Sequence, residues 1–175
     1  LIPNRVGIAE RSAGADNRTR GGHWERDTVV GRKGTSGGLA TAQERKTRLV
    51  VAQRVESMRP IEHLKADQTM FEGMKTLSVS RDNGIENRGH GDLGIPSFFC
   101  DPYSSWQKGG IENANKMLRR YFPKGTDFSD VSQDEVDRAV RLINEKPRRI
   151  LGYRSSLAEA ARLSIIKKSS VLILG

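Results

Sequence analysis

The chain has 175 residues, and its 30 Lys and Arg against 21 Asp and Glu give a formal net charge of +9. That length fits one domain with a short appendage. The single cysteine, Cys100, excludes an internal disulfide, and the lack of a CxxC pair excludes a closed zinc site. The longest apolar runs, such as residues 171–174, are far shorter than the roughly 20 residues that span a bilayer. Because the sequence shows no signal peptide either, we expect a soluble, cytoplasmic chain without a membrane partner.

The positive charge is unevenly distributed along the chain. Residues 28–60 carry seven Lys or Arg and two Asp or Glu, whereas residues 61–101 carry four and seven. A basic body with one acidic segment is typical of a protein that binds a polyanion and also holds metal ions. A basic surface that only interacts with water would have the same composition, so charge alone leaves nucleic-acid binding open.

The first part of the chain predicts an arm followed by a small antiparallel sheet. Residues 1–20 lack hydrophobic periodicity and predict a linker or arm. Near alternation of β-prone residues over 23–30, and apolar runs at 39–43 and 49–55, predict three strands joined by hairpins.

The remainder of the chain alternates helices with short strands. Helical spacing after Pro60 predicts a helix over 61–74, and an Asp-Asn-Gly turn ends a strand at 77–80. Ser132 and Glu135 form a capping box at a helix start. Further elements are expected in this order: a short connecting helix at 87–93, a strand at 97–100, and helices at 110–122, 132–146 and 156–163.

This order of elements predicts the fold class. Three hairpin-linked strands, followed by two strands that helical crossovers connect, describe an α/β fold with a mixed five-stranded sheet flanked by helices. We interpret this pattern as ribonuclease-H-like. The domain is expected to span residues 21–163, and residues 164–175 form a C-terminal tail with no evident partner.

Three acidic residues fall where this topology would bring them together. Asp27 lies in the first strand on the side of Val29, where a carboxylate is costly unless a metal ion or hydrogen bonds compensate it. Asp82 follows the fourth strand, which neighbours the first strand in such a sheet, and Glu112 lies in the first turn of a helix. Three carboxylates without a His or thiolate suit Mg²⁺ or Mn²⁺. Two such ions would serve phosphodiester chemistry.

Each acid also has a purely structural explanation. Asp82 suits the Asx turn that an Asp-Asn-Gly sequence favours, and Glu112 suits the positive end of a helix dipole. Glu25 lies on the same strand face as Asp27 and is an alternative ligand. Each signal is weak when taken singly, and the topology that joins the three acids gives them weight.

Longer motifs point to one family. In chain order they are GHWERDTVVG (22–31), ERKTR (44–48), RDNG (81–84), DPYSSWQKGGIENAN (101–115), LRRYFPKGTDFS (118–129), INEKPRR (143–149) and LGYRS (151–155). In order, spacing and length these motifs resemble the insertion-sequence family-thirty transposases, which belong to the DDE transposase and retroviral-integrase superfamily. The resemblance extends from about residue 2 to about residue 163.

The resemblance implies a reaction and a site. By motif, Asp27, Asp82 and Glu112 correspond to the three catalytic acids, which would bind two Mg²⁺ or Mn²⁺ ions. The implied function is that of a DNA transposase catalytic core, which cleaves at transposon ends to release a 3′-hydroxyl and transfers that end into target DNA without a covalent enzyme–DNA intermediate. Two ends must be cut in concert, so the resemblance also implies a homo-oligomer, associated with the bacterial nucleoid when it is bound to DNA.

Two departures from the family pattern bear on these expectations. Asp82 and Glu112 are 30 positions apart, closer than the family pattern, because the connection over 85–100 is shortened. In the family a helix-turn-helix region precedes the core and recognises the terminal repeats, and residues 1–20 would be the arm that leads from it. We therefore expect non-specific DNA affinity from this segment alone, and its activity as a fragment stays open.

Residues around the third acid are candidate DNA contacts. Glu112, Lys116 and Arg119 share one helix face, so the two cations would hold phosphates beside the metal site. The alternative is a Glu–Lys pair that only supports the helix, worth about 0.3–0.5 kcal/mol. Trp106 would stack on an unpaired base or pack against the core. The candidate contacts are Lys108, Lys116, Arg119, Arg120, Trp106 and Asn113.

Three functions are compatible with the sequence. The leading hypothesis is the catalytic core of a transposase. The second is a related ribonuclease-H-class two-metal nuclease acting on RNA–DNA hybrids or branched DNA, and the third is a DNA-binding remnant without catalysis. The presence of all three acids favours catalysis, whereas the shortened connection favours the remnant.

Overall fold

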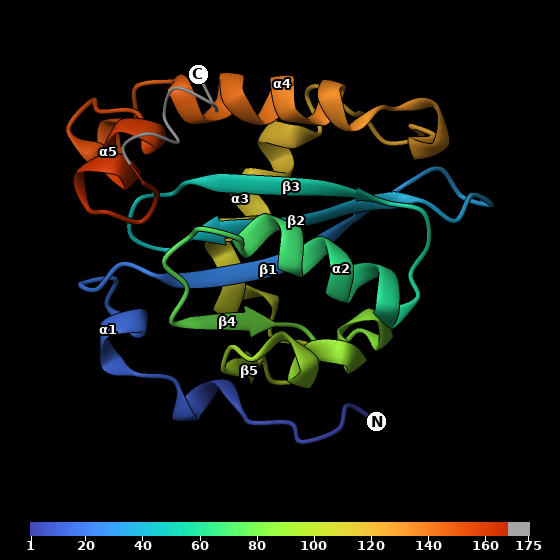
Figure 1. Cartoon of the computed structure of the whole chain (residues 1–175), viewed down its shortest axis with the longest axis horizontal. Coiled ribbons are helices and arrows are strands. Elements are labelled where there is room, and N and C mark those ends of the chain that lie inside the picture. Colours follow the sequence, from blue (N-terminus) through green and yellow to red (C-terminus); the bar gives the residue numbers. More distant parts are fainter. Residues whose placement is uncertain (168–175) are drawn as a thin grey trace.

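A mixed five-stranded sheet with helices on both faces forms the centre of the molecule (Figure 1), and the computed structural model describes residues 1–167. Neighbouring strands β3, β2 and β1 are antiparallel, whereas β1, β4 and β5 are parallel. This arrangement confirms the predicted fold class. In sheet order the strands are β3 (Val50–Val55), β2 (Gly38–Glu44), β1 (His23–Val30), β4 (Ser78–Arg81) and β5 (Ser97–Phe99).

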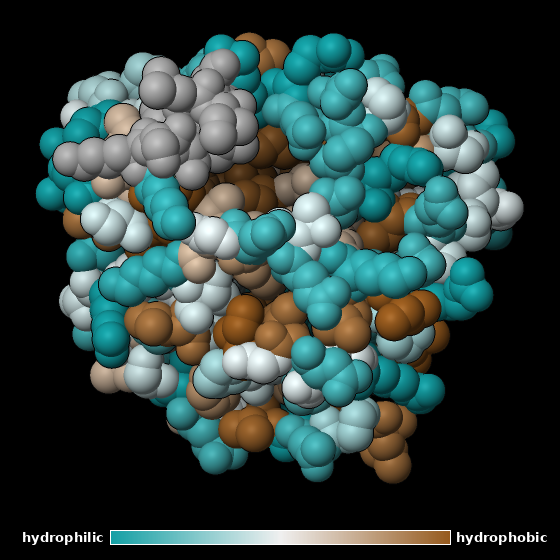
Figure 2. Space-filling model, in the orientation of Figure 1, coloured by the Kyte–Doolittle hydropathy of each residue, from teal (hydrophilic) through white to brown (hydrophobic). Residues whose placement is uncertain are grey.

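Alternation along the strands gives the sheet two unlike faces. Trp24 lies on the face that α2 (Pro60–Phe71) covers, and its ring packs edge-on against Phe71 with the centroids 5.4 Å apart. Asp27 lies on the opposite face, which α3 (Gly109–Leu118) covers. Figure 2 shows hydrophilic side chains around the margin of the α2 face and hydrophobic ones in the hollow below α4. Trp24 is fully buried in the core, on the face opposite the acids.

Most predicted helices are present, but two end earlier than expected. The α2 helix ends at Phe71 instead of residue 74. The α3 helix ends at Leu118 instead of residue 122, and residues 119–122 form turns. The prediction was wrong at this end because Pro123 disfavours helical geometry in the residues just before it. The capping box that opens α4 (Gln133–Glu145) is confirmed. The other helical segments are α1 (Ala13–Asp16) and α5 (Ser156–Arg162), with single-turn 3₁₀ helices at η1 (Ile8–Glu10), η3 (Ser105–Lys108), η4 (Phe128–Asp130) and η5 (Arg149–Leu151) and a longer one at η2 (Ile85–Leu93).

The N-terminal segment packs against the sheet instead of forming a detached arm. It runs beside β5 (Figure 1), and the Phe99 N–H donates a 2.8 Å hydrogen bond to the Val6 carbonyl. The Arg11 guanidinium donates to Ser80 Oγ over 2.8 Å. These contacts cover the outer edge of β5, which would otherwise expose unpaired backbone groups. Residues 1–20 therefore contribute to the domain.

The start of the predicted C-terminal tail also belongs to the core. Ile165 and Ile166 are buried in one cluster with Trp24 and Leu157. Residues 168–175, the rest of the predicted tail, lie outside the described residues. Within residues 1–167, no helix is long and apolar enough to cross a membrane.

Two side-chain amides of α4 form hydrogen bonds with backbone N–H and C=O groups at the outer edge of β3. Asn144 accepts a 2.9 Å hydrogen bond from the Val50 N–H and donates a 2.7 Å bond to the Val50 carbonyl. Three turns away, Gln133 accepts from the Arg54 N–H over 2.7 Å and donates to the Ala52 carbonyl over 3.2 Å. The amides thus replace the partners that a sixth strand would provide.

We predict that Asn144→Ala lowers the free energy of unfolding by about 2–3 kcal/mol, because it leaves the buried N–H and C=O of Val50 without partners. Urea denaturation monitored by circular dichroism measures this change. The exposed neighbour Glu145 provides the control, and Glu145→Ala should change the free energy of unfolding by less than about 0.5 kcal/mol. Equal losses in the two variants would contradict the proposed role of the amide.

Candidate active site

The three predicted acids line one pocket. In the register of β1 and β4, Glu25 pairs with Ser80, so Asp27 and Asp82 extend from the same face of adjacent parallel strands. Together with Glu112 of α3, they line a pocket of about 580 Å³. The topology thus brings the predicted acids to one place.

Lys108, at the end of η3, lies between the two aspartates. Its Nζ is 3.6 Å from Asp27 Oδ1 and 3.4 Å from Asp82 Oδ2, and it donates a 2.9 Å hydrogen bond to the Arg26 carbonyl. The side chain is buried. Lys108 supplies a positive charge between two converging carboxylates and lines the same pocket. Its predicted contact with DNA stays a prediction.

The two aspartates respond differently to this environment. Burial raises the pKa of Asp27 above its ordinary value despite the opposing charge of Lys108. Burial also opposes ionisation of Asp82, but the Lys108 ammonium and the Gly84 backbone N–H outweigh it and hold the pKa of Asp82 below its ordinary value. The side chain with the raised pKa, Asp27, is the less exposed of the two, at 24%, whereas the Asp82 side chain is 42% exposed.

Amide side chains fix the orientation of each carboxylate. Asn115 of α3 donates a 2.8 Å hydrogen bond to Asp27 Oδ2, and its own oxygen accepts from Thr41 over 2.9 Å. Asn87 donates to Asp82 Oδ1 over 2.9 Å, and the Gly84 N–H closes an Asx turn on the same oxygen. The structural explanation of Asp82 as an Asx-turn residue is correct, and it coexists with a place in the pocket.

Glu112 lines the pocket at a different point from the two aspartates. Of the three acids, only Asp27 and Asp82 lie next to the Lys108 ammonium. Within residues 1–167, no three Asp, Glu, His or Cys side chains lie close enough together to hold one metal ion. The described arrangement is therefore a pair of converging carboxylates with a third on the wall of the same pocket.

Glu25, the alternative ligand, anchors α3 instead. It is fully buried, forms an ion pair with Arg45, and accepts a 2.7 Å hydrogen bond from the Ile111 N–H in the first turn of α3. A Cβ atom added at Gly110 would lie 2.8 Å from Glu25 Oε2 and 2.6 Å from Gln43 Oε1. Glycine at this position lets α3 approach the sheet closely enough for the bond, and the bond positions the helix that carries Glu112.

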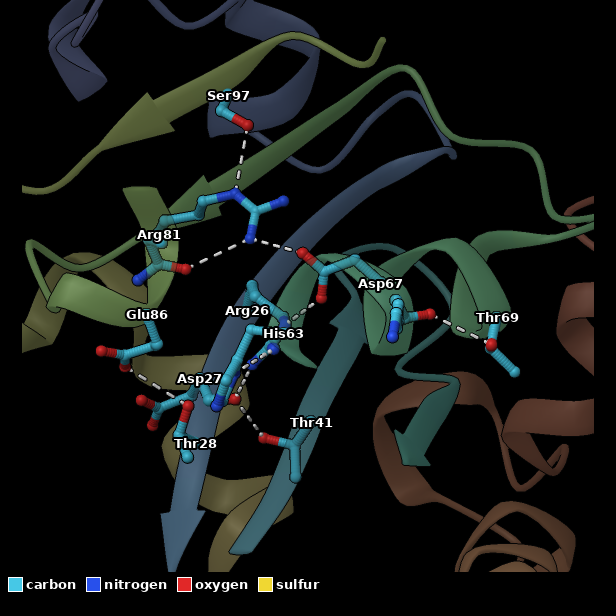
Figure 3. Close-up of polar contacts among 12 residues, drawn as sticks. Arg26, Asp27, Thr28, Thr41, His63, Asp67, Thr69, Arg81, Glu86 and Ser97 are labelled. Carbon is cyan, nitrogen blue, oxygen red and sulfur yellow. Dashed lines mark hydrogen bonds and ion pairs between the residues drawn. The ribbon is translucent and has the colours of Figure 1, made fainter. Parts of the chain in front are cut away.

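A buried ionic network lies on the other side of β1, behind the aspartates (Figure 3). Asp67 of α2 accepts hydrogen bonds of 2.6 Å from Arg26 and 2.7 Å from Arg81. Burial would raise the pKa of Asp67, but the two guanidinium groups hold it below its ordinary value. His63 Nδ1 lies 3.0 Å from Arg26 Nη2. Arg26 also donates to the Asp27 carbonyl, so the network contacts the backbone of a predicted catalytic residue.

The remaining candidate DNA contacts differ in their surroundings. Trp106 is 72% exposed, so it does not pack in the core. The Arg119 guanidinium forms hydrogen bonds within the protein. It donates to the carbonyls of Val30, Phe122 and Pro123, and these bonds connect the end of β1 with the turn after α3. The others, Lys116, Arg120 and Asn113, are exposed.

Sequence reasoning missed residues that complete the site. Glu86 of η2 is buried near Asp82; burial and that neighbouring charge raise the pKa of Glu86. The orienting role of Asn115 is indicated only by its spacing from Glu112, one helical turn on the same helix. Nothing in the local sequence indicates Asn87 or the inward orientation of Lys108, because both depend on contacts across the sheet.

Comparisons with known proteins agree with the predicted class. No family model matches the chain. The catalytic core domain of bovine immunodeficiency virus (BIV) integrase superimposes with a TM-score of 0.61 at 20% identity, over 82% of this chain and 95% of that one. The fold is therefore that of an integrase catalytic core, which is ribonuclease-H-like.

Two curated relatives are transposases of insertion sequences. The transposase of insertion sequence element IS1086 from Cupriavidus metallidurans is 32% identical over 169 residues, which cover 93% of this chain and 50% of that protein. Transposase InsI of IS30A from Escherichia coli is 34% identical over 164 residues, 88% of this chain and 42% of that protein. The chain is similar over most of its length to these insertion-sequence family-thirty transposases, and it spans about half the length of these relatives.

We predict that His63 makes the fold sensitive to mild acid. Burial, followed by the charge of Arg26, lowers the pKa of His63 from 6.5 to about 4. Between these pH values the unfolded chain binds a proton that the folded chain does not bind, so the free energy of unfolding falls as the pH decreases. The contribution of His63 to this loss is about 3 kcal/mol.

Urea denaturation at pH 7 and pH 5 compares the original chain with His63→Gln, which keeps a hydrogen-bond acceptor for Arg26. The variant should lose less stability over this interval than the original chain. The same loss in both chains would show that His63 does not control the acid sensitivity.

Proposed function

We propose that this chain is the catalytic core that cleaves DNA at transposon ends and joins the released 3′ end to target DNA. One observation carries the proposal: Asp27 of β1 and Asp82, which directly follows the adjacent parallel strand β4, converge on the Lys108 ammonium in a pocket that Glu112 also lines. The similarity of the chain to insertion-sequence family-thirty transposases supports the same function. In the cell this activity requires the chain to act on DNA in the cytoplasm, as a homo-oligomer that brings two ends together.

The donors of the pocket fit a hard divalent cation. All three side chains offer carboxylate oxygens, and the position between the aspartates already accommodates a positive charge, that of Lys108. We propose that Asp27, Asp82 and Glu112 hold two Mg²⁺ or Mn²⁺ ions. When bound, such ions activate the attacking water or 3′-hydroxyl and stabilise the leaving oxygen.

The protein residues orient the acids and the substrate. Asn115 and Asn87 each hold one carboxylate oxygen of an aspartate, which leaves the other oxygen directed at the shared position. The exposed cations Lys116 and Arg120 would contact DNA phosphates along α3 and its end, and Asn113 would donate hydrogen bonds to the strand. Trp106, exposed before α3, would stack on an unpaired base.

The proposed reaction is tested by strand cleavage and transfer with labelled DNA in Mg²⁺ or Mn²⁺. We predict that Asp82→Asn lowers the rate at least about a hundredfold, because it removes a carboxylate that would hold the metal ions and so weakens the stabilisation that these ions would give to the leaving oxygen. The assay should include pre-nicked and generic DNA substrates at low salt, because we expect this segment to bind DNA without recognising transposon ends. Asp92→Asn, a change at an exposed acid of η2, should leave the rate unchanged.

Two outcomes would replace the proposal with another function. If the original chain and Asp82→Asn give the same background level of strand cleavage, and the chain still binds DNA in a salt-sensitive way, the result would support a DNA-binding remnant. Metal-dependent cleavage confined to RNA–DNA hybrids would support the related nuclease.

We also predict that Lys108→Gln strengthens Mn²⁺ binding by about tenfold or more, because Lys108 competes with the metal ion for Asp27 and Asp82. Titration of free Mn²⁺ by electron paramagnetic resonance measures this affinity without any reaction. Lys116→Gln removes an equal charge from the exposed surface of α3 and should change the affinity much less. Unchanged Mn²⁺ affinity in Lys108→Gln would show that this lysine and the metal ion do not share a position.

A further inference from the structure

A second, strongly basic pocket lies beside the acidic one. It measures about 270 Å³, and its walls include Arg18, Arg48, Arg148, Gln43, Gly110 and Asn113. These residues come from the N-terminal segment, the turn after β2, the start of α3 and the segment after α4. Four separate parts of the chain thus bring three guanidinium groups to one small cavity.

The charges in this pocket are not balanced by the protein. Within residues 1–167, Arg148 Nη1 is buried without a hydrogen-bond partner. The nearest carboxylate of Arg18 is Glu25, 4.0 Å away, and Glu25 already binds Arg45 and the Ile111 N–H. A buried donor without a partner costs about 1–3 kcal/mol. Of the three arginines only Arg18 lies near a carboxylate, the occupied Glu25, and within residues 1–167 neither Arg48 nor Arg148 forms an ion pair, so the pocket favours an added anion.

Two of the arginines also have unusual backbone conformations. Arg18 has φ 58° and Arg48 has φ 63°, in the left-handed region that is unfavourable for residues with a Cβ. Strain of this kind persists where the surrounding structure requires it, often at ligand sites. Here it accompanies two side chains that line the same cavity.

The basic and acidic pockets lie on either side of the first turn of α3. Glu112 lines the acidic pocket, and the adjacent Asn113 lines the basic one together with Gly110. The start of a helix adds its own positive potential. A polyanionic strand that crosses this turn would place one phosphate at the acids and another among the arginines.

We propose that the arginine pocket binds a backbone phosphate of the DNA strand that reacts at Asp27, Asp82 and Glu112. Planar guanidinium groups bind phosphate oxygens in pairs, and Asn113 adds a neutral donor. The inference rests on the proposed function for its substrate, but it assigns a separate site with a separate test. Because the contact is to the backbone, it contributes affinity and register without base specificity.

Fluorescence anisotropy with labelled duplex and single-stranded oligonucleotides in EDTA tests the pocket without catalysis. The double variant Arg48→Gln/Arg148→Gln should bind about tenfold more weakly at low salt. The slope of log affinity against log salt should decrease by about 0.9 for duplex and about 0.7 for single-stranded DNA, the change expected for one lost phosphate contact.

A matched variant separates a specific pocket from general surface charge. Arg138→Gln/Arg141→Gln removes the same two charges from exposed positions of α4 and should leave both affinity and slope nearly unchanged. Thermal melting checks that each variant is folded; if the glutamine pair unfolds, the single Arg148→Lys variant, which keeps the charge, should still lose affinity because it loses paired hydrogen bonds.

Equal losses in the pocket and α4 variants would overturn the proposal, and so would an original chain with no salt-sensitive DNA affinity. Asp82→Asn should bind with the original salt slope. A chain that binds through the arginine pocket but never cleaves would overturn the proposed reaction alone.

Discussion

The structure depends on how the central strand compensates three consecutive charges, of which two are buried and the third is half-buried. Glu25, Arg26 and Asp27 follow one another in β1, and burying any one of them without a partner would cost several kcal/mol. Since the strand alternates, Arg26 must find its partner on one face of the sheet and the two acids must find theirs on the other. The partners come from three separate elements: Arg45 after β2, Asp67 of α2 and Lys108 before α3.

This charge compensation connects the core with the site. Arg26 bonds to Asp67 through its side chain, and its own carbonyl accepts a hydrogen bond from Lys108, which contacts both aspartates. The α2 face and the acidic pocket thus share one residue. The backbone that carries Asp27 is held from both sides of the sheet, which limits how far the carboxylate would move on the proposed binding of a metal ion.

The sequence predicted those features that depend on local pattern. Strand alternation, the capping box at Ser132 and the Asp-Asn-Gly turn each carry their physical cause within a few residues, and the structure confirms these elements. Contacts between distant segments were not predictable in this way. The inward position of Lys108 requires knowledge of two strands at once, and the packing of residues 1–20 against β5 requires an unpaired sheet edge that only the topology defines. The predicted topology singled out the three acids and the resemblance to a family supported them, but neither indicated which residues hold them.

Glu25 illustrates why the identity of a residue is not enough to assign its role. Its type, strand and face are those of Asp27, so the sequence offered it as a rival ligand. The difference lies in position along the strand: two residues earlier, it meets the first turn of α3 at Ile111, where Gly110 permits close approach. That turn separates the acidic pocket from the arginine pocket, with Glu112 on one side and Asn113 on the other. Because Glu25 fixes the turn, a carboxylate outside the proposed metal site determines where both the reacting phosphate and its neighbour would lie.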